Sequence, residues 1–329
     1  MSLIAGSYEK FVWGFNLSLT QLFSYPSHLS SIKTVAVGGP VAASAGGDET
    51  IKLYDLPSST EIATITPLES SATALSFYTP PSLSFPLNLI SASEDGGVSI
   101  YDANPFVLLK TVSAHKKAVN DLSVHPSGKL ALTVGRDSCL AIVNLVRGRR
   151  SFYCRLGKEA THVNFNSEGD KFFMVAEDKL SVHESEDARL VFELECQKRV
   201  LCATPGSSGL LFTGGEERNI TAWDTISGKV AYCIEGAHSA RVKGIVVHTR
   251  NDGALAGDDP YKVSSASSDG VIRVWDVRMA VKEKPNPLAE ANTKSRLTCL
   301  AGSSLKSFRR KKVGKNVPKE EQSGRMESS

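Results

Sequence analysis

Residues 267–276 read Ser267-Ser268-Asp269-Gly270-Val271-Ile272-Arg273-Val274-Trp275-Asp276: an acidic tight turn, then a strand of alternating apolar residues that closes on an aromatic residue and an acid. Five other segments have the same form and close at positions 55, 102, 144, 184 and 224, although the fourth is one residue shorter. The gaps between closing positions are 47, 42, 40, 40 and 52 residues. A period of about 40–45 residues with a Trp-Asp-like close is typical of β-propeller blades.

The two ends of the chain supply a seventh blade. Gly6–Phe15 aligns with Gly46–Asp55 one period later, and Arg296–Ala301 resembles the first strand of a blade that lacks the others. We therefore predict an all-β, seven-bladed propeller over residues 1–303, monomeric, with its closing blade split between residues 1–25 and 296–303. Closing the ring removes open sheet edges that would otherwise pair with other chains. Blades are numbered 1–6 by closing position, and the split blade is blade 7.

Composition excludes several classes of protein. The 329 residues are 41% hydrophobic and 22% charged, and no apolar run reaches the roughly 18 residues that cross a bilayer. The N-terminus lacks the basic and apolar regions of a secretory signal. The six cysteines form no C-x-x-C pair, so we expect a reducing compartment and neither a zinc site nor a disulfide framework. We expect no membrane association.

The charges are unevenly distributed along the chain. Residues 305–329 carry eight Lys or Arg against three Glu, whereas the preceding residues are nearly neutral. We expect residues 304–329 to form a disordered basic tail. Its basic cluster consists of Lys306, Arg309, Arg310, Lys311 and Lys312. This cluster is a candidate nuclear import signal, a candidate contact for RNA phosphates, or both; the alternative is a solvated tail with neither role.

No catalytic, cofactor-binding or metal-binding motif is present. The sequence contains no P-loop, no H-E-x-x-H and no G-x-S-x-G. The residues at the blade turns are mixed in sign and type (Glu49, Glu94, Arg136, Glu177, Glu216 and Ser268), unlike a ring of catalytic groups. We therefore predict that the protein is not an enzyme and has no cofactor.

The repeats resemble those of the WD40 family, from residue 3 to residue 301. The resemblance implies a buried hydrogen-bond chain in a blade, made by a His, a strand Ser or Thr, the turn Asp and the closing Trp. Blade 6 has every type: His238, Ser265 or Ser267, Asp269 and Trp275. Such networks are costly unless every member is satisfied, so we expect a structural role rather than a His–Asp general base.

Blade 3 offers a second, less complete chain. It has His115, Thr133 and Asp137, but Val143 stands where the Trp is expected. We therefore expect Asp137→Ala to destabilise the protein less than Asp269→Ala.

Several segments resemble a narrower group, the p21-activated protein kinase-interacting protein 1-like family, whose fungal members are the maintenance-of-killer WD-repeat proteins. The segments are residues 5–9, 125–135, 144–149, 265–270 and 292–300. The resemblance implies a non-catalytic scaffold in large (60S) ribosomal subunit assembly and pre-rRNA maturation in the nucleolus of the nucleus. It implies pre-60S ribosomal proteins and assembly factors as partners, with the tail as a candidate contact for pre-rRNA.

Two alternative functions remain open from the sequence. The family resemblance also implies binding and negative regulation of a p21-activated protein kinase, although no segment identifies a kinase-binding surface. A substrate receptor of a ubiquitin ligase, or a propeller enzyme, would have the same fold.

Overall fold

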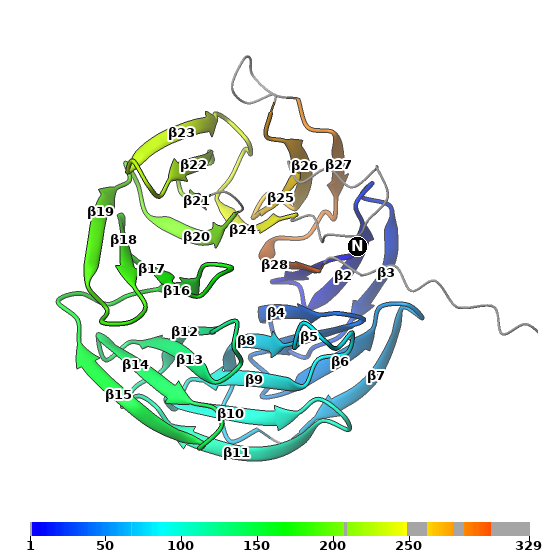
Figure 1. Ribbon diagram of the computed structural model, residues 1–329. Coiled ribbons are helices and arrows are strands. Elements are labelled where there is room, and N and C mark those ends of the chain that lie inside the picture. The colour runs from blue at the N-terminus through cyan, green and yellow to red at the C-terminus, as the bar shows by residue number, and fades with distance from the viewer. Residues whose placement is uncertain (1, 67, 207–208, 249–261, 279–285, 304–329) are drawn as a thin grey trace, which may run out of the picture.

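The computed structural model describes residues 2–66, 68–206, 209–248, 262–278 and 286–303. Its strands form seven four-stranded antiparallel sheets arranged around a central axis, as Figure 1 shows. The prediction of an all-β, seven-bladed ring is confirmed. Within the described residues, no helix is long and apolar enough to cross a membrane. The predicted tail, residues 304–329, lies outside the described residues.

The first three blades follow one another along the chain. Blade 1 contains β4 (Ile32–Gly38), β5 (Val41–Gly46), β6 (Ile51–Asp55) and β7 (Thr60–Ile65). Blade 2 contains β8 (Ala72–Tyr78), β9 (Asn88–Ser93), β10 (Gly97–Asp102) and β11 (Val107–Ser113). Blade 3 contains β12 (Val119–Val124), β13 (Leu130–Gly135), β14 (Cys139–Asn144) and β15 (Arg149–Arg155).

Blades 4–6 repeat the same order, from the inner strand to the outer one. Blade 4 contains β16 (His162–Phe165), β17 (Lys171–Ala176), β18 (Lys179–Glu184) and β19 (Leu190–Glu195). Blade 5 contains β20 (Val200–Pro205), β21 (Leu210–Gly215), β22 (Ile220–Asp224) and β23 (Lys229–Ile234). Blade 6 contains β24 (Val242–Val247), β25 (Lys262–Ser267), β26 (Val271–Asp276) and β27 (Ala289–Asn292). The shorter fourth repeat therefore still forms a full blade.

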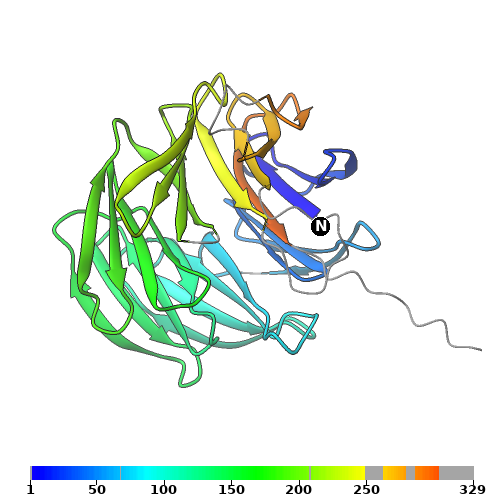
Figure 2. The ribbon, with the colours of Figure 1, turned by 45° about the horizontal axis from the view of Figure 1, so that its top comes forward.

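Blade 7 joins the two ends of the chain. Its order is β28 (Leu297–Ser303), β1 (Ser2–Ser7), β2 (Phe11–Asn16) and β3 (Gln21–Pro26). In the β1–β28 pair, Ile4 lies opposite Ala301 and Ala5 opposite Leu300. The predicted pairing between the C-terminal strand and the N-terminal segment is confirmed, and Figure 2 shows blue β1 beside orange β28.

The apolar core lies between blades rather than within them. Each of seven buried clusters in the described chain draws side chains from two neighbouring blades. The cluster that closes the ring packs Ile4 and Val12 of blade 7 against Ile32 and Tyr54 of blade 1. The inner strands β4, β8, β12, β16, β20, β24 and β28 each contact the next around the ring. This packing makes the ring one cooperative unit, because no blade buries its apolar faces without its neighbours.

Candidate functional site

The His–Asp networks lie in the loops at one end of the ring. In blade 6, Trp275 Nε1 donates to Ser265 Oγ at 2.9 Å, and Ser265 Oγ lies 2.8 Å from His238 Nε2. The structure thus selects Ser265 rather than Ser267 as the strand hydroxyl. The last link is long, because His238 Nδ1 is 3.7 Å from Asp269 Oδ2 and has no hydrogen-bond partner among the described residues. Blade 6 therefore lacks one hydrogen bond of the expected chain.

The carboxylate of Asp269 instead organises its own turn. Its oxygens accept hydrogen bonds from Ser239 N at 3.0 Å, Ser239 Oγ at 2.7 Å and Val271 N at 3.0 Å. Burial alone would raise the pKa of Asp269, but these donors and nearby His238 outweigh it and hold the pKa below its usual value.

Blade 3 contains the better connected network, which corrects the expectation that it is the weaker one. His115 Nδ1 is 3.0 Å from Asp137 Oδ1, and His115 Nε2 is 2.9 Å from Thr133 Oγ1. The second oxygen of Asp137 accepts from Lys116 N at 2.8 Å and from Tyr153 OH at 2.9 Å. Tyr153 lies on the outer strand β15, and its hydroxyl supplies a donor to this network that the missing Trp at position 143 would not suggest.

Blade 1 contains a third network, which the sequence reasoning missed. His28 Nδ1 is 3.0 Å from Asp48 Oδ1, and His28 Nε2 is 2.7 Å from Ser44 Oγ. Ser44 Oγ in turn lies 3.1 Å from Tyr54 OH, so a tyrosine takes the place of the closing Trp. The position of His28 in the sequence indicates this network, because His28 stands four residues before its inner strand, as His115 and His238 do.

Stability should fall as the pH drops from 7 to 5, because burial lowers the pKa of His238 and of His248 to about 4. Histidine titrates near 6.5 in the unfolded chain, so between these values the unfolded chain binds protons that the ring excludes. Each histidine's contribution is present above pH 6.5, and about 2 kcal/mol of it is lost at pH 5. Denaturant unfolding at both pH values measures this loss. The His238→Gln variant should lose less stability between them, and an unchanged pH dependence would contradict the prediction.

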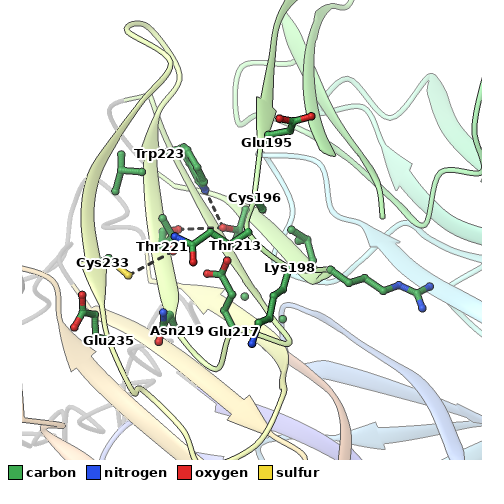
Figure 3. Close-up of a pocket in the computed structure, with 16 residues that line it drawn as sticks. Glu195, Cys196, Lys198, Thr213, Glu217, Asn219, Thr221, Trp223, Cys233 and Glu235 are labelled. Atoms are coloured by element: carbon green, nitrogen blue, oxygen red, sulfur yellow. Dashed lines mark hydrogen bonds between the residues drawn. The ribbon is translucent and has the colours of Figure 1, made fainter. Parts of the chain in front are cut away.

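Blade 5 lacks a histidine at the equivalent place. Cys196 stands four residues before β20, and Glu217 occupies the turn position of the aspartate. Trp223 Nε1 still donates to Thr213 Oγ1 at 2.9 Å. A pocket of about 370 Å³ opens beside these residues and is shown in Figure 3. The smaller Cys196 side chain leaves space in the region that an imidazole fills in blades 1, 3 and 6.

The reactive groups that line this pocket include thiols and carboxylates. Burial raises the pKa of the Cys196 thiol to about 11, so the thiol is neutral and a poor nucleophile at neutral pH. Among the described residues, no group of three His, Cys, Asp or Glu side chains could hold a metal ion. The predicted basic cluster of Lys306, Arg309, Arg310, Lys311 and Lys312 lies outside the described residues.

Comparison with known proteins agrees with the geometry. The family model "WD domain, G-beta repeat" matches residues 106–144 and 231–276, and WD40 propellers typically act as non-catalytic scaffolds. The p21-activated protein kinase-interacting protein 1-like of Danio rerio is 32% identical over 91% of this chain and 80% of its own length. The p21-activated protein kinase-interacting protein 1 of Homo sapiens is 32% identical over 91% of this chain and 76% of its own length. Protein MAK11 of Saccharomyces cerevisiae is 26% identical over 91% and 82%. The chain therefore belongs to the p21-activated protein kinase-interacting protein 1-like family of WD-repeat proteins.

Proposed function

We propose that the protein is a non-catalytic, monomeric scaffold in assembly of the 60S ribosomal subunit, and that it acts in the nucleolus on particles containing pre-rRNA. The proposal rests on the similarity, over 91% of this chain, to a family that includes MAK11. The fold supports it, because seven rigid blades present loops to several partners at once, and three buried networks hold some of these loops in place. Scaffolding requires surfaces rather than a reactive centre.

Affinity purification followed by mass spectrometry, with and without RNase, tests this function. Pre-60S ribosomal proteins and assembly factors should be recovered in both samples if protein contacts hold the scaffold on the particle. Recovery of ubiquitin-ligase subunits without ribosomal proteins would contradict the proposal and favour a ligase receptor.

Binding to a protein kinase is the second candidate function. The Danio rerio and Homo sapiens relatives are named for an interaction with a p21-activated protein kinase. Purified kinase should then form a complex with the purified ring, and kinase activity should fall on binding if the interaction is inhibitory. Absence of a complex at micromolar concentrations would remove this candidate.

The tail cluster gives a separate prediction about RNA. Replacing Arg309, Arg310, Lys311 and Lys312 by alanine should weaken RNA association whatever the RNA sequence, because phosphate attraction does not depend on bases. For single strands the slope of log K against log salt should fall by roughly 0.7 for each lost phosphate contact, or by about 3 at most. Titration of purified protein measures this slope. An unchanged slope, or no RNA binding by wild type at moderate salt, would leave the cluster as at most an import signal.

A further inference from the structure

One backbone position recurs around the mouth of the ring. The residue before an inner strand accepts, through its carbonyl oxygen, a hydrogen bond of 2.8–3.1 Å from the backbone N–H of the turn in the same blade. In blades 1–3 this residue is small: Ser31, Ser71 and Ala118. In blades 5–7 it is Arg199, Arg241 and Arg296. Three consecutive blades therefore present an arginine at equivalent positions.

The ring brings these arginines to one side of its mouth. The inner strands β20, β24 and β28 pack side by side, as Figure 1 shows, so the residues that precede them lie at the same end of neighbouring strands. A pocket of about 750 Å³ lies over blades 5–7. It is lined by Lys198, Arg218, Arg241 and Arg296, together with Glu216, Ser239, Ala240 and Ser268.

The residues that line this basic pocket include four cations and one carboxylate. Within the described part of the chain, Lys198, Arg218 and Arg296 form no ion pair, and Arg241 has only a 3.7 Å contact with Glu216. Arg296 also lies over the ring of Tyr8, with its guanidinium carbon 5.6 Å from the ring centroid.

Three further groups show the electrostatics around the basic pocket. Burial, and then Arg241 and Arg296, lower the pKa of half-buried Lys243 on β24. The nearby carboxylate of Asp269 is engaged by the hydroxyl and backbone N–H of Ser239. A second carboxylate, that of Glu9, accepts a hydrogen bond from Arg296 N at 2.8 Å. The lining itself remains net positive, because its four cations face the single carboxylate of Glu216.

We propose that the basic pocket binds an acidic segment of a partner protein, with the guanidinium groups of Arg241 and Arg296 pairing with its carboxylates. Arginine forks match carboxylates in a bidentate geometry. The hydroxyls of Ser239 and Ser268 already donate to Asp269 and to the carbonyl oxygen of Arg241, so the guanidinium groups supply the recognition. This inference rests on the proposed scaffold function and names the chemistry of one partner surface.

The composition of the basic pocket favours an acidic peptide over RNA. Proteins that hold single-stranded RNA stack successive bases on aromatic side chains. No aromatic residue lines this pocket, and the ring of Tyr8 beside it already faces Arg296. The basic residues are also confined to three blades and are interrupted by Glu216, whereas an RNA backbone is best tracked by a continuous basic groove. A short carboxylate-rich segment needs only a local cluster of cations.

The test uses the full chain with Arg309–Lys312 replaced by alanine, so that the tail does not bind the probe. A dye-labelled ten-residue polyglutamate peptide is titrated at low salt and followed by fluorescence anisotropy. In this background, R241A/R296A should weaken peptide binding about tenfold, because each of the two exposed ion pairs that are lost contributes about threefold to affinity. The matched control is K117A/R136A, which removes two exposed cations from the equivalent loops of blade 3 and should change affinity less than twofold.

Three results would overturn the proposal: no peptide binding by the protein with intact pocket arginines, equal losses in R241A/R296A and the control, or tighter arginine-dependent binding of a ten-nucleotide oligouridine. The melting temperature of each variant verifies that the ring is folded. Failure of the scaffold function is distinguished separately, since it would appear as missing pre-60S proteins in the affinity purification while the peptide titration could still succeed.

Discussion

Deletion of residues 1–15 is expected to abolish soluble, folded protein. The deletion removes β1 from between β28 and β2, together with most of β2. Leu3, Ile4 and Val12 are fully buried, and each contributes about 1.5–3 kcal/mol by leaving water. Their sum is comparable to the whole stability of a domain, about 5–15 kcal/mol. Soluble yield, size-exclusion chromatography and thermal melting measure the outcome.

A matched pair of substitutions distinguishes lost packing from a general effect of truncation. Ile4→Ala should cost about 2–5 kcal/mol, because Ile4 packs against blade 1 in the cluster that closes the ring. Leu22→Ala, on β3 of the same blade, should change stability by no more than about 0.5 kcal/mol, since Leu22 is 43% exposed. A soluble, monomeric deletion variant with unchanged melting would contradict the closure by β1.

Asp137→Ala should destabilise the ring by about 2–4 kcal/mol, more than Asp269→Ala, which reverses the order expected from the sequence. Asp137 accepts from His115 Nδ1, Lys116 N and Tyr153 OH. Removing it leaves a donor of a fully buried imidazole without a partner, and such a donor alone costs about 1–3 kcal/mol. Chemical denaturation of both variants measures the difference.

Asp269→Ala should cost less, about 1–2 kcal/mol. The hydrogen bonds that it loses, to Ser239 and Val271, are at exposed or half-buried groups, and His238 Nδ1 already lacks a hydrogen bond. Asp137→Asn serves as a control that retains the side-chain shape and one acceptor, so it should lose less stability than Asp137→Ala. A larger cost at Asp269 than at Asp137 would show that the 3.7 Å separation understates the interaction between His238 and Asp269.

The candidate site was only partly predictable. The sequence indicated His115, Thr133 and Asp137, and the structure brings them within hydrogen-bond distance of one another. It also indicated the residues of blade 6, but not the long separation between His238 and Asp269. Whether an imidazole reaches a carboxylate depends on shifts of less than 1 Å in two loops, and residue types do not encode such shifts.

The sequence by itself determined the blades and their number. Each blade is indicated by a local pattern: a turn, an alternating strand and a closing aromatic residue with an acid. The spacing of about 40 residues between these patterns gives the number of blades. The complementary fragments at the two ends also determined the closure, because a strand edge without a partner is unfavourable and Arg296–Ala301 matched the missing inner strand.

Only the tertiary structure decided which side chains from different blades meet. Arg241 and Arg296 are separated by 55 residues, and they line one pocket because closing the ring places β24 and β28 side by side. Tyr153 likewise reaches Asp137 from an outer strand. Such contacts depend on the angle between blades and on the path of each loop, which are set by packing of the whole ring rather than by local residue patterns.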